Sequence, residues 1–495
     1  MIYFYLECDA LDNDIRSLFM AFYPGRAIKR IETKEYACAE GDLFLRVCMS
    51  DCAETQCLAN EDNTKKKMTM ELVQDGTLLD DACECELSDR KDTKTKAKCM
   101  LYCLLSKLTK KELPWGTLTG IRPTKIARTM LMEGASDEEC IDYMKNQMLC
   151  GEEKTMLSLD IAKREIKLLD CLDYEDGYSL YVGIAFCPTT CAYCSFTSYP
   201  VSRFGDRVDA YLDSIEKEID YVAEAFKDKK LNTIYIGGGT PTTLEPEQLE
   251  RLLSKIENSF NLSFLQEWTV EAGRPDSITR EKLKAIKSHP VTRISINPQT
   301  MKDETLELIG RRHTVLQVKE AFLLAREEGF DNINMDIIVG LPQETKEDVE
   351  NTLEEIKKLG PDNLTVHSLA IKRAARLNTQ KEEYAGMKSV NSESTMELTQ
   401  DAAEEMGMKP YYLYRQKNMT GNMENVGYAK PGKEGIYNIL IMEEMQTIVA
   451  LGAGAITKAV YPNGRIERCE NVKDIKTYLE KTDEMIERKK RLFAD

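Results

Sequence analysis

The chain has 495 residues, too many for one ordinary hydrophobic core, so we expect two or three domains. Hydrophobic residues make up 42% of it and charged residues 31%, which is typical of globular proteins that fold in water. The net charge of −17 argues against a nucleic-acid backbone as the main partner, because binding that backbone requires a basic surface. No apolar run approaches the length of a membrane span, and the first residues do not resemble a secretory signal. We therefore expect a cytoplasmic protein.

The first 110 residues predict a small α+β domain. Strand-like runs at residues 2–6, 43–48 and 69–72 are mixed with helical stretches, and a charged break is expected at residues 89–98. An ordered loop at residues 113–125 then enters a helix, and helical segments continue to about Leu169. We expect residues 111–175 to form a helical connecting region.

From about residue 179, short apolar runs alternate with amphipathic stretches. The predicted strands are residues 180–184, 233–236, 268–271, 293–296, 333–339 and 364–369, and the predicted helices are 208–226, 246–259, 280–288, 316–328 and 346–359. Strand–helix repeats of this kind imply an α/β fold with a parallel sheet and helical crossovers. Six units fit an open (β/α)6 barrel over residues 176–395, a partial TIM barrel. Chemistry in such barrels occurs at the carboxyl ends of the strands.

The last part of the chain, residues 396–495, predicts a C-terminal α/β extension. It contains a helix, a strand at residues 411–414, an apolar run at residues 436–442 and a final helix near residues 474–491.

Three cysteines are packed into eight residues: Cys187, Cys191 and Cys194. A structural zinc site is closed by four ligands, usually in two separated pairs, so this spacing does not suit zinc. Three thiolates on one tight loop suit a [4Fe–4S] cluster in which one iron lacks a protein ligand. The alternative is three buried thiols in a chain that holds sixteen cysteines. The spacing favours a catalytic cluster.

The cysteine loop, with Tyr193 just before its last cysteine, resembles that of radical S-adenosylmethionine (SAM) enzymes. The segments Tyr-Val-Gly-Ile-Ala-Phe-Cys at 181–187 and Gly-Gly-Gly-Thr-Pro-Thr at 237–242 are similar to those of the oxygen-independent coproporphyrinogen III oxidase group, and within it the HemZ-type coproporphyrinogen dehydrogenases. The resemblance covers about residues 110–480. It implies a radical SAM core that binds SAM at the open iron. It also implies oxidative decarboxylation of two propionates of coproporphyrinogen III to vinyl groups, giving protoporphyrinogen IX.

The resemblance also implies which residues contact the cofactor. Triple glycine allows close approach of a ligand to the backbone, and no Lys-Ser/Thr follows it as in a phosphate-binding loop. For the first SAM, the matching positions are Tyr181, Tyr193, Gly238, Gly239, Thr240 and Glu271, the last of which would accept both ribose hydroxyls. For a second SAM they are Gln299, Arg311 and Asp336. Ala370 and Ile456 fall at further contacting positions, where simple packing is the alternative.

Coproporphyrinogen carries four propionates, so its pocket needs cations inside an acidic protein. Two basic patches qualify: Lys372, Arg373 and Arg376 after the sixth strand, and the run Tyr-Arg-Gln-Lys-Asn at 414–418. Arg122 and Lys125 are weaker candidates, and each patch has a solvated surface as its alternative. A one-electron donor such as flavodoxin or ferredoxin is expected as a partner.

One departure from the oxidase pattern affects the substrate prediction. Gly183 stands where the well-studied oxidases carry histidine, and Ala185 replaces a proline. HemZ-type sequences share the glycine. Two other functions therefore stay open: a haem-binding chaperone without turnover, in which His367 or methionines would hold the haem, and a radical SAM enzyme that opens the haem ring.

The remaining cysteines predict ordinary reduced thiols, because the chain is not expected to be secreted. Those of the N-terminal part match no cluster motif: Cys48, Cys52, Cys57, Cys83, Cys85, Cys99 and Cys103.

Overall fold

The computed structural model describes residues 1–51, 65–120, 122–380, 382–384, 386–387, 389–415 and 423–494. The chain divides into two compact units, Met1–Lys163 and Arg164–Asp495. The finer domain boundaries expected from the sequence, at residues 110, 175 and 395, stay predictions. Within the described ranges, no helix has both the length and the apolarity needed to cross a membrane.

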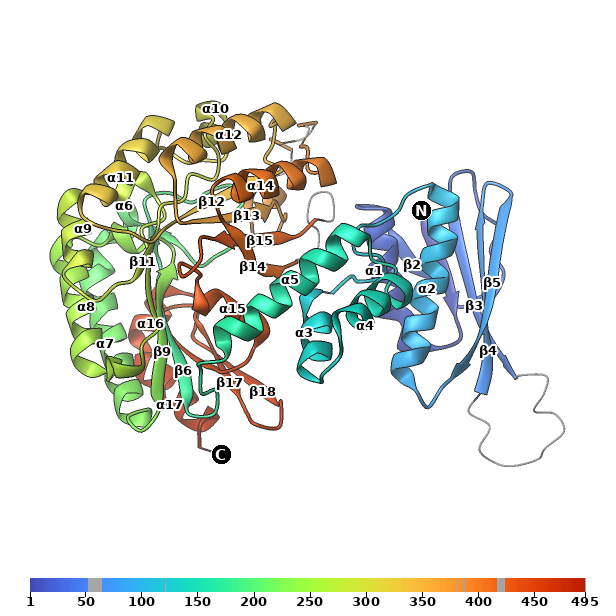
Figure 1. The fold of residues 1–495 in the computed structure, drawn as a ribbon, viewed down its shortest axis with the longest axis horizontal. Helices are drawn as coiled ribbons and strands as arrows, with labels where there is room; N and C mark the ends of the chain where they lie inside the picture. The colour runs from blue at the N-terminus through green and yellow to red at the C-terminus, as the bar shows by residue number, and fades with distance from the viewer. Residues whose placement is uncertain are drawn as a thin grey trace. The chain divides into compact units, whose positions relative to one another are not determined.

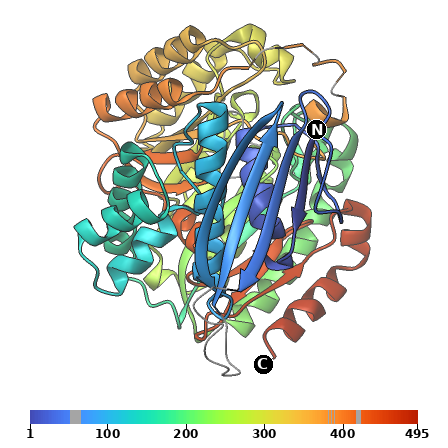
Figure 2. The same cartoon turned by 90° about the vertical axis from the view of Figure 1, so that its right-hand side faces the viewer.

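The first unit contains a five-stranded sheet in the order β2-β1-β3-β4-β5. Its strands lie side by side in Figure 2 and are β1 (Ile2–Leu6), β2 (Ile28–Arg30), β3 (Leu43–Asp51), β4 (Lys65–Gln74) and β5 (Thr77–Glu86). Alternate residues of β4 are buried, as expected for a sheet with one covered face. That face packs against α1 (Asp12–Phe22) and α2 (Arg90–Thr109) in a single hydrophobic core. The predicted α+β character of this part is confirmed.

The charged break expected at residues 89–98 is wrong, because α2 runs through it. The Asp89 carboxylate caps the helix by accepting the Asp92 backbone N–H at 2.9 Å, which satisfies a donor that the helix leaves unpaired. The lysines lie partly or fully exposed, whereas Thr93 and Ala97 are buried. Charged residues with long side chains are good helix formers, so charge alone did not indicate a break. Three further helices follow: α3 (Thr124–Met132), α4 (Asp137–Asp142) and α5 (Glu152–Leu169).

The second unit is built on an eleven-stranded sheet that does not close on itself, in the order β14-β15-β13-β12-β11-β10-β9-β6-β16-β17-β18. All six predicted strands are present and parallel: β6 (Gly177–Ile184), β9 (Lys230–Gly238), β10 (Glu267–Glu271), β11 (Arg293–Ser295), β12 (Ile333–Val339) and β13 (Asn363–Ser368). The open (β/α)6 architecture is thus confirmed.

The predicted crossover helices of this unit are also present. They lie along the outer side of the parallel strands in Figure 1: α7 (Val208–Ala225), α8 (Pro246–Ser259), α9 (Arg280–Lys287), α11 (Val315–Glu327) and α12 (Lys346–Leu359). Shorter elements lie in the loops: β7 (Phe186–Cys187), β8 (Tyr199–Pro200), α6 (Val201–Phe204), α10 (Asp303–Leu308) and α13 (Arg376–Thr379). Predicted site residues lie in the connections after β6, β9, β11 and β13, and Glu271 and Asp336 lie in β10 and β12.

The residues after 395 complete both edges of this sheet. At one edge, β14 (Lys409–Tyr414) and β15 (Asn425–Ala429) pair antiparallel beside β13. At the other, β16 (Thr447–Leu451) pairs parallel with β6, followed by β17 (Ile456–Val460) and β18 (Ile466–Glu470). The helices are α14 (Glu393–Glu405), α15 (Ile436–Glu443), α16 (Ile475–Glu480) and α17 (Thr482–Leu492). The apolar run at 436–442 is therefore a helix.

A buried ion pair attaches α17 to α7. Lys489 donates to the Glu218 carboxylate at 2.6 Å, and both side chains are 0% exposed. The same carboxylate accepts from Asn471 at 2.9 Å, from the Tyr478 hydroxyl at 2.5 Å and from the Gly452 backbone N–H at 2.9 Å. A buried carboxylate is tolerated when its oxygens are satisfied in this way. This network joins the C-terminal residues to the crossover helix that follows the cysteine loop.

Lys489→Ala should reduce the stability of the second unit strongly. The change leaves Glu218 buried without its counter-ion, and breaking such a pair costs about 3–5 kcal/mol. Lys490→Ala is a matched control, because Lys490 and Glu487 form a pair more than half exposed on the same helix, where the effect should stay within about 1 kcal/mol. Urea denaturation followed by circular dichroism compares the two variants. Equal losses would show that the Glu218 network is not important for stability.

Candidate cofactor and substrate site

A cavity of about 350 Å³ extends inward from the carboxyl ends of the parallel strands. It is lined by residues from each of β9 to β13, from the cysteine loop and from the C-terminal part of the chain. Most of the predicted site residues line it: Cys187, Cys191, Tyr193, Cys194, Gly238, Gly239, Thr240, Glu271, Gln299, Arg311, Asp336 and Ala370. Tyr181 and Ile456 are not among its lining residues.

The three cysteines lie on the loop that begins at β7. Cys187 and Cys191 are buried, and Cys194 is partly buried. Burial raises the pKa of the Cys187 thiol to about 11 and raises that of Cys194 as well. The thiols of Cys187 and Cys194 are therefore protonated at neutral pH, and a metal must displace their protons to bind. Three soft sulfur ligands in a sheltered loop fit an iron–sulfur cluster.

Close contact between this loop and the end of β9 requires glycine. A β-carbon at Gly239 would lie 2.8 Å from the Ile184 carbonyl oxygen and 3.0 Å from the Cys187 sulfur, and still nearer to the Phe186 carbonyl oxygen. Gly238 has φ +101°, a conformation that side chains disfavour. Thr240 follows, and its hydroxyl donates to the Cys187 sulfur at 3.5 Å. The glycines thus bring the Thr240 hydroxyl against the first cysteine.

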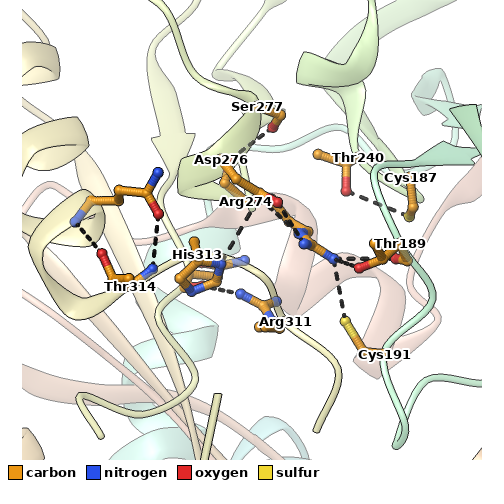
Figure 3. Close-up of polar contacts among 12 residues, drawn as sticks. Cys187, Thr189, Cys191, Thr240, Arg274, Asp276, Ser277, Arg311, His313 and Thr314 are labelled. Atoms are coloured by element: carbon orange, nitrogen blue, oxygen red, sulfur yellow. Dashed lines mark hydrogen bonds and ion pairs between the residues drawn. The ribbon is translucent and has the colours of Figure 1, made fainter. Parts of the chain in front are cut away.

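Arg274 contacts the second cysteine, as Figure 3 shows. It is 3% exposed, and its Nη1 atom donates to the Cys191 sulfur at 3.8 Å and to the Thr189 hydroxyl at 2.8 Å. Its Nε and Nη2 atoms form a two-point pair with Asp276, at 3.0 and 2.7 Å. The sequence analysis did not identify Arg274. The available signal was a charged residue three positions after Glu271, at the end of a buried strand.

His313 lies beside Asp276, the partner of Arg274 (Figure 3). Its Nδ1 atom lies 3.9 Å from Asp276 Oδ1, and its side chain is 0% exposed. Burial, together with the nearby cation of Arg311, lowers the pKa of His313 to about 3. His313 is therefore neutral at physiological pH, and Arg274 supplies the charge that balances Asp276.

Glu271 ends β10 and faces the cavity. Burial raises its pKa to about 7, although the Tyr235 hydroxyl donates to it and opposes the shift. The Tyr235 ring stacks on Tyr437 with centroids 4.5 Å apart, and Tyr181 stacks against both rings at 6.3 Å. Tyr181 thus lies in an aromatic group behind Glu271, where it does not line the cavity.

The positions expected to contact a second SAM lie together across the strands β11 and β12. Gln299 has φ +69°, which is unfavourable for a residue other than glycine, and its N–H donates to the Asp336 carbonyl at 2.9 Å. Arg311 donates from Nε to the Tyr193 hydroxyl at 3.2 Å and from Nη1 to the Asn297 carbonyl at 2.5 Å. The Nε and Nη1 atoms of Arg311 therefore already donate hydrogen bonds to other residues of the protein.

Asp336 stays ionised although it is enclosed. Burial raises its pKa, but bonding to His367 and Asn334 outweighs burial, and the pKa lies below its usual value. Asn334 Nδ2 donates to Asp336 Oδ1 at 2.6 Å, and His367 Nε2 lies 3.6 Å from Oδ2. The cavity therefore holds two carboxyl groups with different charge states near pH 7.

Comparisons with known proteins agree with this geometry. Residues 181–356 match the family model of the Radical SAM superfamily. Over 391 residues the chain is 44% identical to the oxygen-independent coproporphyrinogen-III oxidase-like protein HemZ of Bacillus subtilis, covering 77% of each chain. The chain belongs to the oxygen-independent coproporphyrinogen III oxidase family of radical SAM proteins. The cofactors of this family are a [4Fe–4S] cluster and SAM.

One further relative and one solved structure are also similar to this chain. The heme chaperone HemW of Bacillus subtilis is 34% identical over 280 residues, covering 56% of this chain and 70% of HemW. The solved coproporphyrinogen III oxidase HemN of Escherichia coli has a TM-score of 0.51 and 24% identity, over 63% of this chain and 70% of that structure. The second match shows that the fold is shared.

The residues of the predicted basic patches differ in whether they line the cavity. Lys372 lines the cavity and lies 5.9 Å from the Phe196 ring centroid, whereas Arg373 is exposed. Arg376 donates to the Thr190 carbonyl at 3.1 Å, so it supports the cysteine loop. In the second patch, Tyr414 lines the cavity and Arg415 is buried, while residues 416–418 lie outside the described residues. Arg122 and Lys125 belong to the first unit.

The remaining predictions concern positions away from the cavity. Ile456 is 44% exposed on β17, so its proposed cofactor contact stays a prediction. Of the N-terminal cysteines, Cys52 and Cys57 lie outside the described residues, and the others lie in the first unit, where none of them forms a disulfide within the described part of the chain.

Replacing Arg274 should change the reduction potential of the radical SAM cluster. A cation and hydrogen-bond donor beside a cysteine sulfur stabilises the more negative, reduced cluster. Arg274→Gln should therefore lower the midpoint potential, and Arg274→Lys should lower it less, as measured by redox titration monitored by electron paramagnetic resonance. An unchanged potential in Arg274→Gln would show that the contact with Cys191 does not affect the cluster.

SAM binding should strengthen as the pH rises from 6 to 8. Glu271 is mostly protonated at pH 6 and ionised at pH 8, and only the carboxylate can accept both ribose hydroxyls. If only the ionised form binds, SAM affinity increases about tenfold over this range. Glu271→Gln should bind SAM weakly without this increase, which calorimetry at several pH values checks. An identical pH profile in wild type and variant would exclude Glu271 as the titrating group.

Proposed function

We propose that the protein is an oxygen-independent coproporphyrinogen III oxidase. It converts two propionates of coproporphyrinogen III to vinyl groups by oxidative decarboxylation, giving protoporphyrinogen IX. The observation that carries the proposal is one cavity, lined by three cysteines, by Glu271 and by cationic side chains, in a chain 44% identical to a coproporphyrinogen-III oxidase-like protein. The cysteines suit the cluster, Glu271 suits the ribose of SAM, and the cationic side chains suit a substrate with several carboxylates.

The roles assigned to residues follow from their positions. Cys187, Cys191 and Cys194 hold the cluster, and its open iron accepts the first SAM. Gly238, Gly239 and Thr240 approach the methionine end of SAM, and Glu271 accepts from its ribose. When bound, the cluster and SAM supply a 5′-deoxyadenosyl radical that removes hydrogen from the β-carbon of a propionate. Gln299, Arg311 and Asp336, with Ala370 beside them, form the place for a second SAM.

The chain's own residues keep the reacting groups dry and oriented. The sulfurs of Cys187 and Cys191 and the Arg274 side chain are buried, which limits the access of water to this part of the cavity. Lys372 at the cavity wall is available for a propionate. Loss of CO2 and of one electron to an acceptor completes each vinyl group, and a flavodoxin or ferredoxin supplies the electron that reduces the cluster.

A haem chaperone is the second candidate, because HemW proteins are among the relatives. His367 is poorly placed as a haem ligand. Its Nε2 atom lies 3.6 Å from Asp336, and its Nδ1 atom lies 3.4 Å from the Tyr414 hydroxyl. Both ring nitrogens thus face other groups. This arrangement favours the enzyme.

An anaerobic assay tests the proposal. Reconstituted, reduced protein given SAM and coproporphyrinogen III should yield vinyl product, CO2 and 5′-deoxyadenosine. Replacing Cys187, Cys191 and Cys194 together by alanine should remove the cluster absorption and all product. Cys171→Ala, at an exposed cysteine, should change neither. Stoichiometric haem binding without product would favour the chaperone, and conversion of haem to a linear tetrapyrrole would favour the ring-opening enzyme.

A further inference from the structure

Arg293, the first residue of β11, is a buried cation without a counter-ion. Its side chain lines the cavity, and the residue is 1% exposed. Its Nε atom has no hydrogen-bond partner in the described part of the chain. Across the residues that the structure describes, no carboxylate oxygen lies within 4.0 Å of its guanidinium. Buried arginines are normally paired, so this one requires an explanation.

The carboxylates whose charges interact with Arg293 accept hydrogen bonds from other residues. Glu267 accepts from the Tyr437 N–H at 3.0 Å and the Thr269 hydroxyl at 2.6 Å, Glu271 accepts from Tyr235, and Asp336 accepts from Asn334. Burial acts to lower the pKa of Arg293, but negative groups around it, Glu267 and Asp336 among them, raise the pKa above its ordinary value. Arg293 therefore keeps its charge.

The strand register places Arg293 deep in the cavity. Arg293 pairs with Thr269, and Ser295 pairs with Glu271. Two residues along a strand span about 7 Å, so Arg293 lies about that far below Glu271, away from the carboxyl ends where the cysteine loop lies. The cavity thus has a cofactor end and an inner end.

Aromatic and apolar residues accompany Arg293 in the cavity wall. The guanidinium Cζ atom lies 3.6 Å from the position of a β-carbon at Gly435, so α15 begins beside it. The same helix contributes Ile441 and Met442 to the cavity, and β14 contributes Tyr412. A cation beside aromatic and apolar side chains, in a wall that also holds polar residues such as Asn334 and Asn438, suits a ligand with an apolar body and a carboxylate.

We propose that Arg293 binds a carboxylate of the substrate at the inner end of the cavity. This inference rests on the proposed function, which makes the carboxylate a propionate of the tetrapyrrole. The planar guanidinium can hold a carboxylate by two parallel hydrogen bonds, which lysine cannot. A propionate held there extends its methylene groups toward the strand ends. SAM is the other source of a carboxylate in this cavity, and the experiment separates the two.

The test compares Arg293→Met, Arg293→Lys and the control Arg251→Met, in the full chain with its cluster. Arg251 of α8 is paired with Glu216 and Asp213 of α7, and it does not line the cavity. Three quantities are measured: binding of coproporphyrin III and of its uncharged tetraamide by fluorescence, binding of SAM by calorimetry, and the melting temperature without ligand. KM for coproporphyrinogen III is then compared with kcat.

Wild type and Arg251→Met should bind coproporphyrin III at least about tenfold more tightly than the tetraamide. Arg293→Met should lose this preference and raise KM by about tenfold or more, with SAM binding unchanged. Arg293→Lys should keep part of the preference. The melting temperature of Arg293→Met should be equal to or above that of wild type, because an unpaired buried charge has been removed.

Three results would overturn the assignment of Arg293. They are a retained carboxylate preference in Arg293→Met, a loss of SAM binding instead, or a lower melting temperature with unchanged KM, which indicates a structural role. Failure of the proposed function looks different. Wild type would then make no vinyl product at all, whereas the loss of carboxylate preference in Arg293→Met would still support the binding role of Arg293.

Discussion

The site depends on backbone contact between the cysteine loop and the end of β9. The Gly239 N–H donates to the Ile184 carbonyl at 2.6 Å, and the Thr240 N–H donates to the Phe186 carbonyl at 2.7 Å. These bonds continue the β6–β9 pairing past the last regular residues of the sheet. They leave no room for a β-carbon at Gly239. The position of Cys187 relative to the glycine loop is therefore determined by main-chain geometry, and side chains elsewhere can vary without moving it.

Cations are concentrated inside a protein that is acidic overall. Arg274, Arg293 and Arg311 are all less than 8% exposed, and all line the same cavity. Arg274 is balanced by Asp276, and Arg311 is bonded to Tyr193 and a carbonyl oxygen, whereas Arg293 is unbalanced. The cavity thus gathers cations although the chain as a whole has a net charge of −17. A negatively charged ligand would be repelled by the exterior and attracted once it enters.

The sequence predicted the regular part of the second unit well. The apolar runs that became β6, β9, β10, β11, β12 and β13 are buried on both faces, and such strands have a simple sequence signal. The strands β15, β16, β17 and β18 were not predicted. The edge strand β18 has mixed polarity and little burial, whereas β16 is a short apolar run whose five residues are mostly buried between β6 and β17. The helix α2 was mistaken for a charged break, because its buried side shows only in the tertiary structure.

The site residues also divide into those that the sequence could identify and those that it could not. Residues in compact motifs, such as the cysteines and glycines, could be found by spacing and family resemblance. Arg274 and Arg293 could not, because an arginine near a strand end has no local pattern that distinguishes a buried cation from a surface one. Only their burial and partners identify them.

The pairing of β16 with β6 has a consequence for synthesis of the chain. Residues 447–451 lie beside residues 178–182, which precede the cysteine loop. Until residues 447–451 have emerged from the ribosome, β6 has a free edge next to the segment that must receive iron and sulfide. Free edges of this kind promote aggregation. Cluster insertion into the nascent protein is therefore best timed after residues 447–451 have been synthesised, and products that end before them should be insoluble instead of partly active.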